Sequence, residues 1–221
     1  MKNWHQISKR EKLEILNKIA LRREITASDV EKDWWIIETI HLIFQTRLSS
    51  HLLLKGGIAF NKAWNITEKL PADIDLALDK SFYGLNGSLN TSQLTTIQKR
   101  LYNYINEQFY PSLKQKFKDK ELNVLIHLNQ NSEHQNIILE IHYSSLVKYP
   151  KHVKSKIVLK INYNSDWTSF KLKPLSSLIA SHYTNSIIAD TDNPAKIPCL
   201  SPQEGFQHSI KEKMTDSCKQ N

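Results

Sequence analysis

Two aspartates, Asp73 and Asp75, stand one residue apart in the segment DIDLAL. In a β-strand, side chains alternate between the two faces, so both carboxylates point the same way while Ile74, Leu76 and Leu78 point to the core. Two carboxylates this close repel each other, and a divalent cation between them would relieve the repulsion. Carboxylate oxygens are hard ligands that suit Mg²⁺, which recruits substrate phosphates. The pair therefore predicts a metal site that handles phosphate, although the solvated face of an edge strand has the same pattern.

A pair of glycines stands shortly before the aspartates. Gly56 and Gly57 follow the apolar segment HLLL and precede a helical pattern. Such a turn lets backbone N–H groups approach a phosphate, with the start of the helix facing the anion. Lys55 and Lys62 flank the turn and would neutralise phosphate charge. The turn therefore favours a phosphate-handling site over a merely solvated strand.

A third carboxylate, Glu140, lies in the segment IILEIHY. If Ile137, Leu139 and Ile141 face the core, Glu140 faces the other side with His142 beside it. On a strand next to the two aspartates, Glu140 would complete a two-metal clamp for in-line phosphoryl chemistry. A surface glutamate on a half-exposed strand is the alternative, and both interpretations stay open.

The composition is that of a globular protein. The chain has 221 residues, of which 40% are hydrophobic and 24% charged, and this excludes a disordered chain. No apolar run approaches the roughly 18 residues that span a bilayer, and the first residues have no apolar signal core, so we expect no secretion. The cysteines Cys199 and Cys218 have no metal-type spacing and fit a reduced, cytoplasmic protein.

The charge of the chain is positive and uneven. The net charge of +8 favours polyanionic partners. Between Ile141 and Lys173 many lysines accompany a single acid, Asp166, and aromatic residues are interleaved with them. Lysine with aromatics suits phosphate contact plus base stacking, whereas a solvated lysine-rich face is the alternative. The lysines are Lys148, Lys151, Lys154, Lys156, Lys160, Lys171 and Lys173, and the aromatic residues are Tyr143, Tyr149, Tyr163, Trp167 and Phe170.

The elements that must position these residues form an α+β pattern. Capping-box spacing in SKRE and in SDVE predicts two N-terminal helices, starting at Ser8–Glu11 and Ser28–Glu31, and the second carries Trp34 and Trp35 into the core. The later elements are strands at 51–54, 73–78, 121–128, 136–143 and 157–163, and helices at 58–64 and 91–108, the last ending near Pro111. Signals weaken from Lys171 onward. We expect a mixed sheet with helices packed on it.

The segment LLLKGGIAFNKAWNITEKLPADIDLALD resembles the AbiEii/AbiGii-type nucleotidyltransferase toxins, whose pattern is KGG-T-x-x-x-K followed by R-x-S-x-DIDL. The segments EKDWW and ILEIHYSSL are similar to the same family, so the resemblance spans roughly residues 4 to 204. It implies a DNA-polymerase-β-like nucleotidyltransferase fold and Mg²⁺-dependent transfer of a nucleotide from an NTP to an acceptor, which is tRNA in characterised relatives. It also implies the toxin of a toxin–antitoxin or abortive-infection system, with an antitoxin protein as partner.

The resemblance implies specific site residues in this sequence. The catalytic and metal-binding residues would be Asp73, Asp75 and Glu140, holding two Mg²⁺ ions. The nucleotide-binding residues would be Gly56, Gly57, Lys55, Lys62 and Lys69, with Lys62 contacting phosphate or acting structurally.

This sequence departs from the family pattern inside the site. Ile58 stands in place of the threonine after KGG, which removes a hydroxyl from the phosphate turn. Lys69, Leu70 and Pro71 stand in place of R-x-S. Lysine keeps the charge but loses the bidentate fork of arginine. Proline at position 71 lacks both a hydroxyl and an N–H.

The residues after LSPQE depart further. Family members continue with a helix resembling R-T-F-x-E-K, whereas this chain reads GFQHSIKEKMTDSCKQN. Phe206 matches the family phenylalanine, and Ser209 stands where lysine is expected, unless Lys211 or Lys213 substitutes from a shifted helix. We therefore expect a helical segment at 1–48, a nucleotidyltransferase core at 49–200, and a degenerate or truncated tail at 201–221. An inactive remnant that only binds nucleic acid or an antitoxin, or a plain structural α+β domain, would be the alternative.

Overall fold

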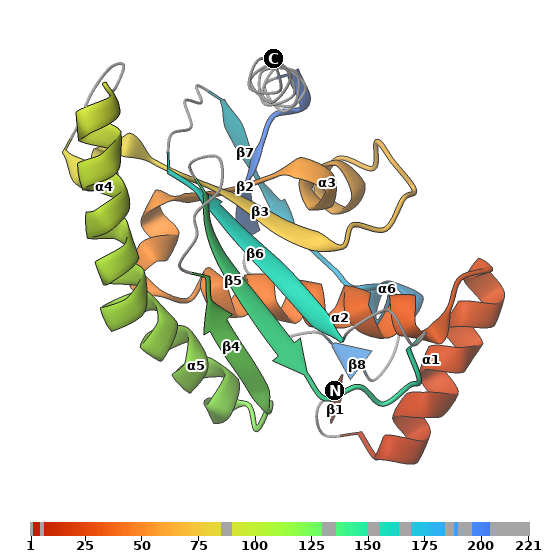
Figure 1. Cartoon of the computed structure of the whole chain (residues 1–221). Coiled ribbons are helices and arrows are strands. Elements are labelled where there is room, and N and C mark those ends of the chain that lie inside the picture. The colour runs from red at the N-terminus through yellow and green to blue at the C-terminus, as the bar shows by residue number, and fades with distance from the viewer. Residues whose placement is uncertain are drawn as a thin grey trace, which may run out of the picture.

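The computed structural model describes residues 2–4, 7–84, 90–129, 136–149, 155–163, 169–183, 188–189 and 196–203. Within these residues the main sheet has seven strands in the order β4-β5-β6-β3-β2-β9-β7, and β1 pairs with β8 in a second, two-stranded sheet (Figure 1). The strands are β1 (Lys2–Asn3), β2 (Leu52–Lys55), β3 (Asp73–Leu78), β4 (Val124–Leu128), β5 (Asn136–Tyr143), β6 (Lys156–Asn162), β7 (Phe170–Pro174), β8 (Ile188–Ala189) and β9 (Lys196–Leu200). The sheet is mixed, because β3 is parallel to β6 but antiparallel to β2.

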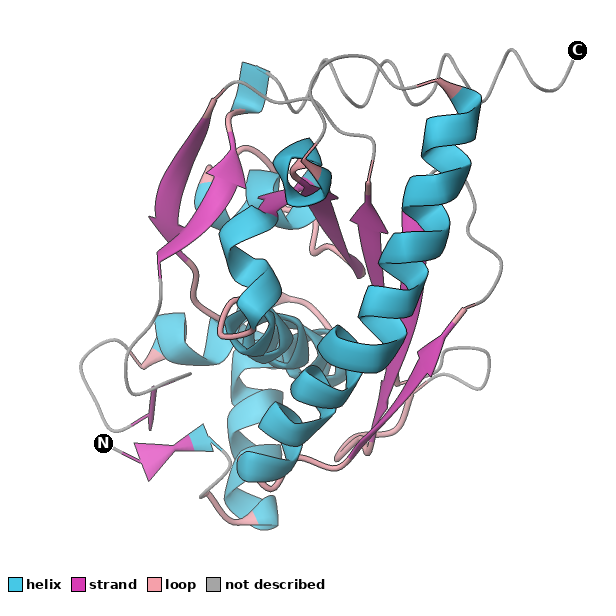
Figure 2. Cartoon of the chain, turned by 90° about the vertical axis from the view of Figure 1, so that its left-hand side faces the viewer, coloured by secondary structure: helices cyan, strands magenta, loops and turns pink. Residues whose placement is uncertain are grey.

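Helices cover one face and one edge of this sheet. In Figure 1, α2 crosses behind the strands, and the long helix formed by α4 and α5 runs along the side where β4 lies, as Figure 2 also shows. The helical elements are α1 (Lys9–Arg23), α2 (Ala27–Ile43), α3 (Gly56–Ile58), α4 (Thr91–Tyr104), α5 (Tyr110–Asp119) and α6 (Leu178–His182), with 3₁₀ turns at Arg47–His51 and Lys80–Tyr83 and π turns at Ala59–Ala63 and Ile105–Phe109. The predicted α+β fold with helices on a mixed sheet is therefore confirmed. Among the helices of the described segments, none has the length and apolar composition that a bilayer crossing requires.

The start of α2 differs from its predicted position. Ser28–Glu31 does not form the cap, because Thr26 and Asp29 form it: each side chain accepts a hydrogen bond from the backbone N–H of the other, at 3.1 Å. Glu31 instead turns inward and accepts hydrogen bonds from the backbone N–H of Leu146, at 2.7 Å, and from the Ser145 hydroxyl. In α1 the expected cap is present, since Ser8 accepts from the Glu11 N–H. TASD and SDVE have the same capping spacing, so local spacing alone does not choose between the two starts, and Glu31 is engaged by Leu146 and Ser145 instead.

Pro111 does not end the helix that was predicted at 91–108. The prediction placed the end near Pro111, but helix continues through the π turn Ile105–Phe109 into α5. Pro111 lies in the first turn of α5. A π turn changes the hydrogen-bond pattern of the preceding helix, which lets a residue without an N–H follow it.

The core lies between α2 and the sheet and includes residues of most of the described helices and strands. Trp34 and Trp35 are buried in it, as predicted, and the Trp35 ring stacks on Tyr143 with ring centroids 4.7 Å apart. This single cluster joins residues of α1 and α2 to residues of β2, β3, β5, β6 and β9. Residues of the predicted segments 1–48 and 49–200 therefore share one cluster, and the boundary at residue 48 stays a prediction.

Candidate active site

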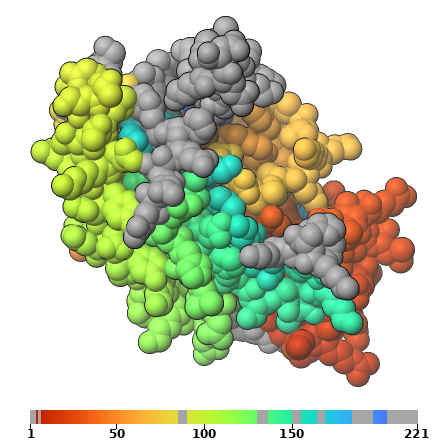
Figure 3. Space-filling model, in the orientation of Figure 1, coloured from red at the N-terminus to blue at the C-terminus, as the bar shows by residue number. Residues whose placement is uncertain are grey.

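The sheet face that α2 leaves uncovered carries the two aspartates. Ile74, Leu76 and Leu78 are fully buried, whereas Asp73 and Asp75 are half-buried on the opposite face of β3. The alternation predicted from DIDLAL is therefore confirmed. Figure 3 shows atoms of β5 and β6 at the surface between α1 and the α4–α5 helix, on this same side of the molecule.

The glycine turn closes directly onto the second aspartate. Gly56 has a φ of +70°, and a Cβ atom built there would lie 2.5 Å from Oδ2 of Asp75. Only a residue without a side chain fits this conformation and this approach. Gly57 is also close to the aspartate segment, since a Cβ there would lie 3.4 Å from Cβ of Pro71. The two ends of the predicted motif thus meet in space, as a shared phosphate and metal site requires.

Lysines surround the two aspartates. Lys55 on β2 and Lys160 on β6 are the register partners of Asp75. Lys160 Nζ lies 3.0 Å from Oδ2 of Asp73. Burial lowers the pKa of Lys32 on α2, and the charges of Asp73 and Asp29 oppose that shift. Such a concentration of ammonium groups suits a ligand with several negative charges.

Glu140 lies in line with Asp73 but not beside it. We expected its strand to neighbour β3, and this was wrong, because β6 lies between β3 and β5. Asp73 and Glu140 are both register partners of Val158, so their backbones are separated by two strand spacings, roughly 10 Å. Within the described residues, no group of three His, Cys, Asp or Glu side chains is arranged to hold a metal ion. The role of Glu140 as a metal ligand stays a prediction.

Glu140 has partners of its own. Its Oε1 lies 2.5 Å from Lys156 Nζ, and its Oε2 lies 3.1 Å from His142 Nε2. The hydrogen bond from Lys156 holds the pKa of Glu140 below its usual value, and so does the one to His142. The carboxylate is therefore ionised and paired near neutral pH.

Lys62 has a structural position. Its Nζ lies 2.5 Å from Oδ1 of Asp33 on α2, and the two side chains are 9% and 3% exposed. Asp33 also accepts a hydrogen bond of 2.6 Å from the Leu178 N–H at the start of α6. Of the two roles proposed for Lys62, this contact supports the structural one. Sequence reasoning missed Asp33, whose signal is a charged residue within an apolar helix.

Lys69 lies on the exposed loop between the glycine turn and β3. The Asn61 side chain donates hydrogen bonds to the carbonyl oxygens of Thr67, at 2.7 Å, and of Lys69, at 3.3 Å. The loop is therefore tied back to the helical segment after the glycines. The structure brings Lys69 into no described contact with Asp73 or Asp75.

Two aromatic residues of the lysine-rich segment are buried and not available for stacking. Tyr143 and Tyr163 are buried, and the Tyr149 hydroxyl is hydrogen-bonded to that of Tyr143 at 2.7 Å. The base-stacking interpretation is therefore wrong for Tyr143 and Tyr163, because their rings are buried. For Tyr149, which is half-buried, base stacking stays a prediction. Phe170 on β7 is 51% exposed. Trp64 was not singled out from the sequence, and its ring centroid lies 4.4 Å from Lys173 Nζ.

Several predicted positions lie outside the described residues. They are Lys151, Lys154, Asp166, Trp167, Phe206, Ser209, Lys211, Lys213 and Cys218. The predicted tail at 201–221 is described only at 201–203.

A glycine turn that closes on a strand bearing two aspartates, within a mixed sheet backed by helices, is consistent with a nucleotidyltransferase-like fold. The chain belongs to the family described as nucleotidyl transferase AbiEii toxin, type IV toxin–antitoxin system, whose model matches residues 41–206. This match confirms the resemblance seen in the sequence and includes the glycine turn, Asp73, Asp75 and Glu140. A comparison with curated proteins gave no match.

Proposed function

We propose that this protein transfers a nucleotide from an NTP to an RNA acceptor, with tRNA as the first candidate, in a Mg²⁺-dependent reaction. It would act in the cytoplasm as the toxin of a toxin–antitoxin or abortive-infection system, with an antitoxin protein as partner. The observation that carries the proposal is the approach of Gly56 to Asp75, because it joins a phosphate-binding turn to a carboxylate pair. The family match supports the reaction class.

The residues present fit a divalent cation. Asp73 and Asp75 offer hard oxygen ligands on one face of β3, half-buried and next to a turn whose backbone N–H groups suit phosphate. Two Mg²⁺ ions would lower the pKa of the acceptor hydroxyl and neutralise the leaving pyrophosphate. Glu140 would serve as a further ligand only after releasing Lys156.

The protein's own groups would order the substrates for the reaction. The Gly56–Gly57 turn would hold the triphosphate, and Lys55, Lys160 and Lys32 would balance its charge. The acceptor hydroxyl would form a bond to the α-phosphorus as the bond to pyrophosphate breaks, and its proton would pass to solvent. The net charge of +8 supports a polyanionic acceptor such as RNA.

A second candidate function is an inactive module that binds nucleic acid or an antitoxin. The observation that favours it is that Asp73 and Glu140 are each already paired with a lysine, Lys160 and Lys156. Carboxylates neutralised within the protein have less need of a metal ion.

Incubation with labelled NTPs, Mg²⁺ and total tRNA separates the two functions. We expect the wild-type protein to transfer label, Asp73→Asn to abolish transfer while keeping the fold, and the exposed control Asp119→Asn to transfer normally. Full transfer by Asp73→Asn would refute the assignment of the site. Binding of tRNA without transfer by the wild-type protein would support the inactive module.

A further inference from the structure

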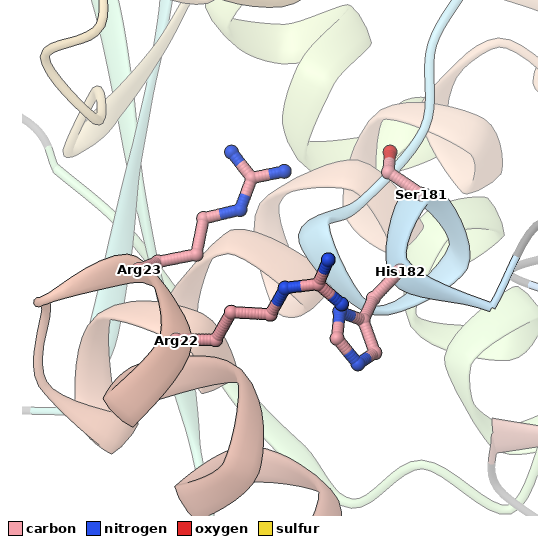
Figure 4. Close-up of a pocket in the computed structure, with 4 residues that line it drawn as sticks. All are labelled: Arg22, Arg23, Ser181 and His182. Atoms are coloured by element: carbon pink, nitrogen blue, oxygen red, sulfur yellow. The ribbon is translucent and has the colours of Figure 1, made fainter.

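A polar pocket lies between the end of α1 and the short helix α6, away from the aspartates. It has a volume of about 510 Å³ and is lined by Arg22, Arg23, Ser181 and His182. Figure 4 shows both guanidinium groups reaching from the last turn of α1 toward α6, which carries Ser181 and His182. Two elements far apart in the sequence thus line one hollow, in which the Ser181 hydroxyl already donates to the Ser177 carbonyl oxygen at 2.8 Å.

The pocket is positively charged. Among the described residues, its lining contains no carboxylate. Partial burial, followed by the charges of Arg22, Lys18 and Arg23, lowers the pKa of His182. The positive charges of these side chains therefore act on the imidazole, and the charge of Arg23 also acts on the Asp33 carboxylate. The planar guanidinium group of arginine donates two parallel hydrogen bonds to phosphate oxygens, a geometry that suits phosphate binding better than that of other side chains.

A simpler explanation accounts for part of this arrangement. Arg22 and Arg23 stand in the last turn of α1, where basic residues favour the negative end of the helix dipole. The interaction with the helix dipole involves α1 alone and needs no residue of α6. It does not explain why Ser181 and His182 of α6 complete a concave, polar surface around the same guanidinium groups. The shape and the lining point to a ligand.

The wall formed by α6 is fixed to the active-site scaffold. Leu178, in the first turn of α6, donates its N–H to Asp33, which also pairs with Lys62 in the turn after α3. The glycine turn in turn closes on Asp75 of β3. An anion held in the pocket would therefore stand in a fixed relation to the glycine turn and to β3.

We propose that this pocket binds a backbone phosphate of a nucleic acid strand and thereby orients the acceptor RNA; the identity of the acceptor rests on the proposed function. The volume lies in the range of roughly 300–1,000 Å³ that small-molecule pockets have, so it admits a nucleotide unit and not only a phosphate ion. Free phosphate has the same chemistry, so the experiment must distinguish the two sources.

The test measures binding of a short fluorescent single-stranded RNA by anisotropy, without NTP or Mg²⁺. The pocket variant is Arg22→Gln/Arg23→Gln, and the matched control is Arg47→Gln/Arg100→Gln, which removes two exposed arginines elsewhere. We expect the pocket variant to weaken binding about tenfold and to lower the slope of log K against log salt by about 0.7, which is roughly the contribution of one neutralised phosphate of a single strand. The control is expected to change affinity less than about twofold.

A second measurement follows the His182 imidazole by NMR during titration with inorganic phosphate. Equal weakening of RNA binding in both variants would overturn the proposal, because any loss of positive charge would then suffice. Unchanged RNA binding, with a phosphate-induced shift of His182 that the pocket variant loses, would show a free-phosphate site and overturn the nucleic acid assignment. Because binding is measured without NTP, a protein that transfers no nucleotide can still confirm the pocket, and an active one can still refute it.

Discussion

The Asp33 carboxylate lies 2.5 Å from the ammonium group of Lys62, and both side chains are almost fully buried. This ion pair joins α2 to the helical segment that follows the glycine turn. Asp33 also accepts the Leu178 N–H of α6, so one carboxylate ties three elements together. The pair therefore fixes the position of the turn that the proposed reaction uses.

Replacing Asp33 should destabilise the fold strongly. We expect Asp33→Ala to lower the free energy of unfolding by about 3–5 kcal/mol at pH 7, because it leaves the Lys62 ammonium buried without its partner. The double variant Asp33→Ala/Lys62→Met should recover part of that loss. Urea denaturation measures both. The exposed pair of Arg10 and Glu14 gives the control, since Glu14→Ala should change stability little. A loss from Asp33→Ala as small as that of the control would contradict a structural role for the pair.

Replacing Gly56 should impair transfer more than stability. In Gly56→Ala the new methyl group would displace the Asp75 carboxylate, 2.5 Å away. Gly84→Ala is the matched control, because Gly84 has a φ of +66° and nothing within 4 Å of a built Cβ. Both variants should lose roughly 1–2 kcal/mol from the positive φ, and only Gly56→Ala should lose nucleotide transfer. Melting curves and the labelled-NTP assay separate the two effects, and equal activities would show that Asp75 tolerates displacement.

Replacing Lys160, which pairs with Asp73, should show whether the Asp73 carboxylate binds a metal ion. We expect Lys160→Met to raise affinity for Mn²⁺, used in place of Mg²⁺ and measured by electron paramagnetic resonance, because the competing ammonium 3.0 Å away is gone. Its affinity for NTP should fall, since a positive charge is lost next to the triphosphate. Lys156→Met is the control, because Lys156 pairs with Glu140. If Lys156→Met raises Mn²⁺ affinity as much, Glu140 is also a ligand; if neither variant does, Asp73 is not one.

The buried His41 on α2 should make the protein less stable in acid. Burial, and next the charge of Lys120, lower the pKa of His41 from 6.5 to about 4, so the unfolded chain binds a proton more readily than the folded one. Stability from this group is complete above pH 6.5 and is lost as the pH falls toward 4, by about 3 kcal/mol in total. Denaturation curves at pH 7 and pH 4.5 should show a smaller loss for His41→Leu than for the wild-type protein. The exposed control His127→Gln should keep the full loss, and an unchanged pH dependence in His41→Leu would exclude His41 as its source.

Local patterns in the sequence predicted the elements whose signals lie within a few residues. The strand Asp73–Leu78 and the strand Asn136–Tyr143 have the predicted bounds, because alternating burial is visible in the letters themselves. The strand β7 was missed, since FKLKP lies at the edge of the sheet and has no buried face to create an alternating pattern.

Local sequence patterns could not predict contacts between distant segments. Lys160 reaches Asp73 from β6, and nothing near this lysine in the sequence indicates a carboxylate partner. The order of strands in the sheet could not be predicted from local patterns either. We therefore expected the strand of Glu140 to neighbour that of Asp73, whereas β6 lies between them. Burial of Tyr143 against Trp35 likewise depends on a helix more than a hundred residues earlier in the chain.

Val158 occupies the row between Asp73 and Glu140 and is half-buried on their face of the sheet. The substitution Val158→Asp would place a carboxylate one strand spacing, about 4.8 Å, from the backbone on either side. Three acidic side chains would then stand abreast on three adjoining strands, without any change in the path of the chain. The scaffold is thus one amino-acid exchange away from a carboxylate triad, a short route for natural drift or for an engineer who wishes to strengthen metal binding.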